Sequence, residues 1–122
     1  MEVEKRLKEM GVELPEAPRP RGAYVPVVVA GRLAFVSGEK ASVGGVMRYK
    51  GKVGSDLSLE EGYEAARICG INCLAALKTA IGDLDKVERV VKVEGYVNSA
   101  PGFNQQPKVV NGASELFLKA FG

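Results

Sequence analysis

The 122-residue sequence contains no histidine and no tryptophan, and it has only two cysteines. Without histidine there is no Ser-His-Asp or Cys-His nucleophile pair, no histidine general base and no histidine metal ligand. Cys69 and Cys73 stand four residues apart, which places both on one face of a helix. With no third cysteine, we expect structural thiols rather than a zinc site. Any catalysis would therefore come from carboxylates, lysine, arginine, tyrosine, serine, cysteine, backbone amides or ordered water.

Long hydrophobic runs and an excess of one charge are also missing. No apolar stretch approaches the ~18 residues of a membrane span, and the charged start, residues 1–5, lacks the core of a signal peptide. We therefore expect a cytoplasmic protein without a membrane partner. Lys and Arg number 17 against 15 Asp and Glu, and the signs are interleaved. A nucleic-acid binder usually concentrates its positive charge, and here the nearest approach to a basic patch is three residues, Arg48, Lys50 and Lys52. RNA is therefore a less favoured partner than a small molecule.

The length fits one domain, residues 1–122, in two parts. Residues 2–10 have the spacing of a short amphipathic helix. Three prolines at positions 15, 18 and 20 then predict an extended connector. We expect residues 1–21 to be this helix and connector, and residues 22–122 to form the core.

The core alternates strand and helix patterns. Residues 25–30 and 33–37 are valine-rich runs around Gly31-Arg32, which predicts a hairpin. A short strand is expected at 46–49, and Ser58 to Glu61 forms a capping-box pattern before a helix that stops at Gly82. Residues 87–98 alternate with period two, as in a strand, and a last helix follows from about Pro107. This order predicts an α+β fold with the helices on one face of a mostly antiparallel sheet.

Three places carry side chains suited to binding a small molecule. Ser37-Gly38-Glu39 ends the second strand, where a glycine admits a ligand to the backbone and a carboxylate can orient water or accept a proton. Tyr24 precedes the first strand, and Pro101 and Phe103 follow the long one. Each place also has a purely structural explanation: a strand-ending turn, a half-buried edge aromatic and a turn into the last helix. The residues alone leave both explanations open.

A set of landmarks runs through residues 22–122, and it is specific only as a set. The landmarks are Gly22-Ala23-Tyr24, the run from Gly31 to Glu39, Gly51-Lys52-Val53-Gly54, Asn72-Cys73-Leu74-Ala75-Ala76-Leu77, the run from Gly82 to Val87, Tyr96-Val97-Asn98 and Asn111-Gly112-Ala113-Ser114. In this order they resemble the RidA/YjgF family of reactive-intermediate deaminases, which typically has Ser-Gly-Gln where this sequence has Ser37-Gly38-Glu39.

The resemblance implies a chorismate-mutase-like fold and a homotrimer with ligand pockets in the clefts between subunits. It also implies hydrolysis of enamine or imine intermediates, such as 2-aminoacrylate, to a 2-keto acid and ammonia without a cofactor. On this pattern Glu39 is the expected catalytic residue. The residues expected to bind a substrate with a carboxylate are Tyr24, Ser37, Gly38, Pro101 and Phe103. A non-catalytic ligand-binding or protein-stabilising module is the alternative, and an endoribonuclease or translation inhibitor, as described for some members, is a further one.

The resemblance also implies a difference at the end of the chain. Family members usually continue into two more strands, which supply an arginine for the substrate carboxylate and a glutamate that helps to position water. This sequence ends at Phe121-Gly122, so we expect a fold without those strands. Arg32, Arg67 and Arg89 fall in a turn, on a helix and on the earlier strand, and lysine does not reproduce bidentate carboxylate binding. We therefore expect impaired activity in this form.

Overall fold

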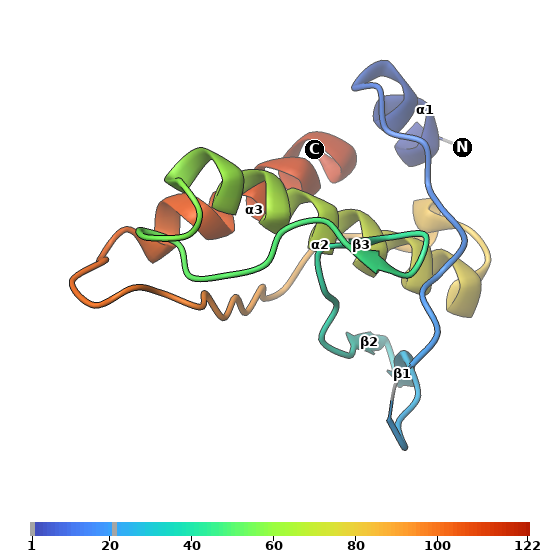
Figure 1. The fold of residues 1–122 in the computed structure, drawn as a ribbon. Coiled ribbons are helices and arrows are strands. Elements are labelled where there is room, and N and C mark those ends of the chain that lie inside the picture. The colour runs from blue at the N-terminus through green and yellow to red at the C-terminus, as the bar shows by residue number, and fades with distance from the viewer. Residues whose placement is uncertain (1, 21) are drawn as a thin grey trace.

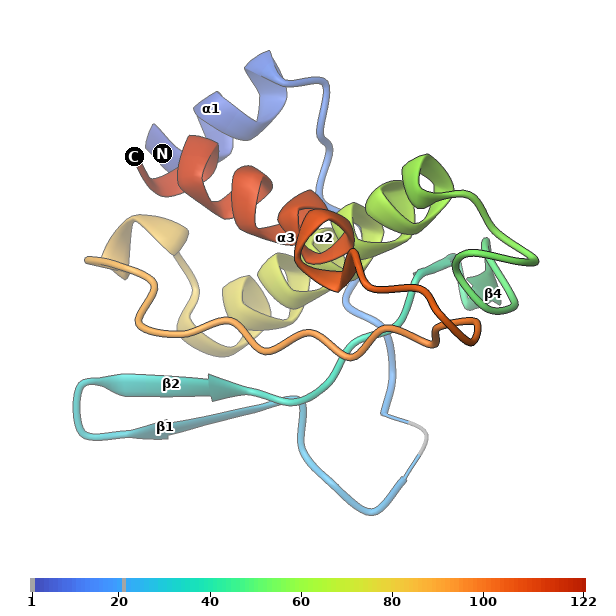
Figure 2. The same cartoon turned by 90° about the vertical axis from the view of Figure 1, so that its left-hand side faces the viewer.

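The chain has an α+β architecture in which the helices lie on one side of a layer of hairpins and extended chain (Figures 1 and 2). The computed structural model describes residues 2–20 and 22–122. The elements are α1 (Glu2–Glu9), β1 (Val27–Ala30), β2 (Leu33–Val36), β3 (Ser42–Val43), β4 (Val46–Met47), α2 (Leu59–Ile81), the 3-10 turn η1 (Leu84–Lys86) and α3 (Gln106–Phe121). The predicted fold class is confirmed. Within the described ranges, no helix is long and apolar enough to cross a bilayer.

Helix α2 begins and ends where the sequence predicts. The Ser58 hydroxyl accepts a hydrogen bond from the Glu61 N–H at 3.1 Å, and the Glu61 carboxylate accepts one from the Ser58 N–H at 3.0 Å. This reciprocal capping box satisfies two backbone donors that a helix start leaves open. At the other end, Gly82 has a φ of +87°, which favours glycine, and its N–H donates to the Lys78 carbonyl at 2.7 Å.

Helices α2 and α3 pack with almost no space between their backbones. A Cβ built at Gly112 on α3 would lie 2.0 Å from the Tyr63 carbonyl oxygen on α2. One turn further along α3, Leu116 and Ala113 fill the space above Gly70. Only glycine permits this approach, and it lets Leu116 reach the core between the two helices.

Helix α1 lies against the end of α3 and the turn η1. Its buried side chains are Val3 and Leu7, which join the same core as Leu116. The Asp85 carboxylate accepts hydrogen bonds from the N–H groups of Glu2 and Val3 at 2.8 and 2.9 Å, so a residue of η1 caps the start of α1. The predicted N-terminal helix is therefore confirmed, and it is a packed part of the helical layer.

Two short hairpins occupy the other side of the molecule. β1 and β2 pair antiparallel, with Val27 opposite Val36 and Ala30 opposite Leu33 around the predicted Gly31-Arg32 turn. β3 and β4 pair in the same way around Gly44-Gly45. The sequence predicted a single strand at 46–49, so β3 is an addition. The two hairpins form separate two-stranded sheets.

The predicted strand at 87–98 is not confirmed as a strand. The segment runs extended through the layer below α2 (Figure 2), but it forms no ladder with any other part of the described chain. Side chains are exposed on both of its faces, including Val91 at 76% and Tyr96 at 90%. The alternating pattern is a property of the residues, whereas a strand also needs a neighbour that pairs with its backbone. The first bridge comes at Ser99, opposite Val53.

The contact between α2 and α3 makes Gly112→Ala a sharp test of this packing. We expect the free energy of unfolding to fall by about 1–3 kcal/mol, because the added methyl group pushes the two backbones apart. Denaturant unfolding measures this loss. Asn111→Ala is the matched control, since position 111 is exposed on the same helix and alanine is the better helix former. Equal unfolding midpoints for Gly112→Ala and the parent chain would contradict the close approach.

Candidate functional site

The chain bends at the end of β2 and forms a corner. There Ser37 lies beside the segment that follows Tyr24, and Ser37 and Tyr24 are both predicted site residues. The Ser37 N–H donates to the Pro26 carbonyl at 2.8 Å, and the Ser37 hydroxyl donates to the Val25 carbonyl at 2.7 Å. These bonds extend the hairpin by one step and fasten Ser37 beside the segment that follows Tyr24. The Tyr24 side chain is about half exposed. At Gly38 a Cβ would meet nothing within 4 Å, so the backbone there is open to a ligand.

Glu39 turns from this corner toward α2. Its side chain is half-buried, and burial raises the pKa of its carboxyl above the ordinary value of 4.5. The carboxyl therefore keeps its proton to a higher pH than a solvated glutamate, as suits a group that exchanges protons with a substrate. The carbonyl of the next residue, Lys40, is bonded to Asn72 on α2, and the Glu39 charge raises the pKa of Cys69 and Cys73 on the same helix.

The two cysteines are free and partly buried. Burial, with a smaller contribution from the Glu39 charge, raises the pKa of Cys69 to about 11 and that of Cys73 to about 12. Both thiols stay protonated near neutral pH, and a thiol is a poor nucleophile. The interpretation as structural thiols therefore agrees with their surroundings. Among the described residues, no group of three histidine, cysteine or acidic side chains could hold a metal ion.

Pro101 and Phe103 belong to a different corner of the chain. Val53 bridges Ser99, and its carbonyl accepts the Ala100 N–H at 2.9 Å. The Phe103 ring packs on Gly54, where a Cβ would lie 3.0 Å from the ring. This turn therefore lies beside residues 51–54, on the β4 side of the molecule (Figure 2). Within the chain as described, no hydrogen bond joins it to the Tyr24–Ser37 corner.

Asn72 lies close to Glu39, and sequence reasoning did not single it out as a site residue. Its Nδ2 donates to the carbonyl oxygens of Lys40 and Ser42, both at 2.9 Å. The available signal was a carboxamide placed next to the apolar run that starts at Leu74 in the middle of a helix. The pattern shows that such a residue needs a partner, but it does not show which segment supplies the partner.

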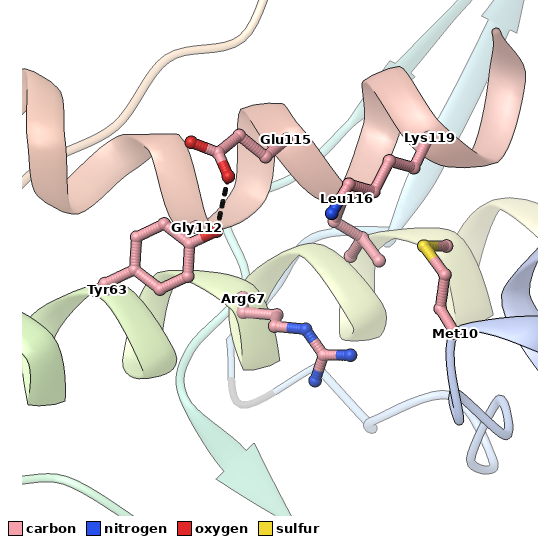
Figure 3. A pocket seen from close by; sticks show the side chains of 7 residues that line it. All are labelled: Met10, Tyr63, Arg67, Gly112, Glu115, Leu116 and Lys119. Atoms are coloured by element: carbon pink, nitrogen blue, oxygen red, sulfur yellow. Dashed lines mark hydrogen bonds between the residues drawn. The ribbon is translucent and has the colours of Figure 1, made fainter.

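A cavity of about 240 Å³ opens on the helical side, away from all the predicted site residues (Figure 3). Its lining comes from α2, α3 and the residue after α1: Met10, Tyr63, Arg67, Gly112, Glu115, Leu116 and Lys119. The Tyr63 hydroxyl donates to the Glu115 carboxylate at 2.7 Å, and this bond raises the pKa of Tyr63. Arg67 lies 3.7 Å from Glu64. Three of the four polar side chains in the lining thus have partners within the chain.

The hairpin layer is apolar and open. Its exposed large hydrophobic side chains are Val25, Val28, Val29, Leu33, Phe35, Val43, Val46, Met47, Val90, Val91, Val93 and Tyr96. They come from both hairpins and from the extended segment. Exposed apolar side chains that gather into one patch are typical of association sites.

Sequence and structure comparisons identify the class of this protein. Residues 4–122 match the family model described as "YjgF/chorismate_mutase-like, putative endoribonuclease". The chain therefore belongs to the YjgF family, as the resemblance implied.

Individual relatives agree with this assignment. Protein TCP17 of Trypanosoma cruzi is 44% identical over 118 residues, which are 95% of this chain and 72% of that protein. A crystal structure from Shewanella oneidensis MR-1, titled as a "putative endoribonuclease", superposes with a TM-score of 0.96 at 35% identity, covering all of this chain and 81% of that one. Atu1372 of Agrobacterium tumefaciens, titled as having unknown function, gives 0.89 at 40% identity, covering 99% and 73%.

The position of Glu39 beside the two cysteines can be tested through their titration. In Glu39→Gln we expect the pKa of both thiols to fall, because a negative charge that opposes thiolate formation is removed. Burial remains, so both values stay above the ordinary 9.0. The rate of iodoacetamide alkylation as a function of pH measures the change. Glu94→Gln, at an exposed carboxylate on the extended segment, is the control. Unchanged thiol titration in Glu39→Gln would place Glu39 elsewhere.

Proposed function

We propose that this protein hydrolyses small enamine and imine intermediates of the 2-aminoacrylate type to 2-keto acids and ammonia. The observation that carries the proposal is the corner at the end of β2, where the fastened Ser37, the open Gly38 backbone and the half-buried Glu39 follow one another. Family membership supports it, because the chain aligns with the YjgF model through this whole region. The chemistry requires neither a metal ion nor an organic cofactor.

The reaction needs proton transfers and one water molecule. Protonation of the enamine carbon of 2-aminoacrylate yields the iminium ion, and water then adds to its C=N carbon. The resulting carbinolamine loses ammonia, so 2-aminoacrylate and water yield pyruvate and ammonia. Glu39 is the group that exchanges protons in this scheme, since burial raises the pKa of its carboxyl and so favours the protonated form. The Tyr24 hydroxyl and the Gly38 backbone orient the substrate.

The complete pocket, in this proposal, forms between subunits of a homotrimer. The Tyr24–Ser37 corner and the Pro101–Phe103 corner lie apart in one chain, so a second copy brings the complementary half. The open apolar layer supports association, because an area of this kind is costly to leave in water. Arg6 donates to the Ala120 carbonyl and Arg32 pairs with Glu88, so these two arginines already have partners within the chain.

The proposal is tested by measuring 2-keto acid release from enzymatically generated 2-aminoacrylate. We expect a rate above the spontaneous background, and a loss of about 10²- to 10⁴-fold in Glu39→Gln, because the proton-transfer group is removed. Glu94→Gln is the control for a change of charge alone. A well-folded protein with no rate above background would refute hydrolysis and favour the non-catalytic ligand-binding alternative.

The same assay tests the shared pocket. Glu39→Gln and Phe103→Ala impair opposite halves, so chains of the two variants, mixed and reassembled, regain activity that neither has alone if the pocket lies between subunits. Sedimentation of the parent chain gives the number of subunits. A monomeric, active chain would refute the shared pocket while leaving hydrolysis intact.

Endoribonuclease activity is the second candidate function, favoured by the family description and by the name of the Shewanella relative. Arg48, Lys50 and Lys52 are exposed at alternate positions, where they can contact a phosphate backbone. If this function holds, cleavage of a defined RNA should persist through repeated purification, weaken with added salt and fall in a variant with all three cations changed to glutamine. Disappearance of cleavage on repurification would exclude it.

A further inference from the structure

Asn72 is the one polar side chain buried within the described part of the chain, with 2% of its surface exposed. A carboxamide removed from water destabilises the fold unless its hydrogen-bonding groups find partners. Here both N–H groups of Nδ2 have one, the carbonyl oxygens of Lys40 and Ser42. Asn72 therefore ties α2 to the segment that directly follows Glu39.

That segment is held at three consecutive carbonyl groups. Asn72 binds those of Lys40 and Ser42, and the carbonyl of Ala41 between them accepts the Arg48 N–H at 2.9 Å. The Arg48 bond continues the β3–β4 pairing within the same hairpin, whereas the Asn72 bonds link the segment to α2. Asn72 thus fixes the distance between residues 40–42 and α2.

Glu39 lies between this clamp and a second fixed point. On the other side Ser37 is fastened to the Val25 and Pro26 carbonyls, so only Gly38 separates Glu39 from it. Cys69 and Cys73 on α2 are the titratable groups whose pKa the Glu39 charge raises, and the next residue, Lys40, is exposed. Because Gly38 is the flexible part of this short span, the clamp at 40–42 decides where Glu39 lies.

We propose that Asn72 is the positioning residue of the site. Its two hydrogen bonds to the carbonyls of residues 40 and 42 hold the Glu39 carboxyl near α2, in the position from which it transfers the proton. This inference rests on the proposed hydrolysis, in which Glu39 transfers the proton. Asn72 itself touches no substrate. Its role is to prevent the carboxyl from moving with the loop into solvent.

The test compares Asn72→Ala with Ile71→Ala, the adjacent residue on α2, which packs against the core instead. In Asn72→Ala we expect kcat for 2-aminoacrylate hydrolysis to fall by about ten- to a hundredfold with little change in KM, because Glu39 is misplaced. Since a more solvated Glu39 has a lower pKa, the limb of the pH profile on which activity is lost as Glu39 deprotonates should move to lower pH. Alkylation of Cys69 and Cys73 should become several-fold faster. Ile71→Ala should change none of these, and Asn72→Gln, which keeps the carboxamide, should restore part of the rate.

Each outcome supports or overturns the proposal. A folded Asn72→Ala with parental pH profile and parental thiol alkylation would overturn it. If Asn72→Ala does not fold, hydrogen exchange of the parent chain decides: the Asn72 side-chain amide should exchange far more slowly than those of the exposed Asn104 and Asn111, and equal rates would overturn the clamp. If the parent chain hydrolyses nothing, the proposed function fails. Thiol alkylation and a carbon-13 titration of Glu39 then still test whether Asn72 positions it.

Discussion

The backbone contact between Gly112 and the Tyr63 carbonyl is the constraint on which the rest of the structure depends. It fixes the separation of α2 and α3 at a distance that allows no Cβ, and the buried side chains then fill a core of set width. α2 becomes the common support of the molecule. On one side it carries α3 and, through the shared core, α1. On the other it carries Asn72 and the cysteine face, against which the loop after β2 lies.

The predicted site residues are divided between two corners of this frame. One corner ends β2 and holds Ser37 by two backbone carbonyls. The other packs Phe103 on the turn at Gly54. Under the proposed function, each chain therefore contributes half of a shared site. The cavity on the helical side does not replace this site, since Tyr63 and Glu115 already bind each other there. This division follows from the fold. The end of β2 is bonded to residues 25 and 26, whereas the turn at 99–103 packs on residues 53 and 54.

Local patterns in the sequence predicted the elements whose stability is local. The capping box at Ser58, the stop at Gly82 and the turn at Gly31-Arg32 each act within a few residues, and each lies where it was expected. The segment at 87–98 differs because a strand is defined by its neighbour, and alternation of Val91 with charged residues says nothing about that neighbour. The same limit applied to the site. Ser37 bonds to the two residues that follow Tyr24, which the hairpin pattern makes foreseeable, whereas the carbonyls that Asn72 binds lie 30 and 32 residues away along the chain.

The charged residues between the exposed valines of residues 88–97 affect how this segment can associate. An extended run with unpaired backbone groups and exposed valines is a template for uncontrolled strand addition. Glu88, Arg89, Lys92 and Glu94 interrupt the valines at close intervals. A second copy of this segment that pairs here can bring like charges opposite each other, which costs free energy. The interleaved charges thus disfavour aggregation along this segment.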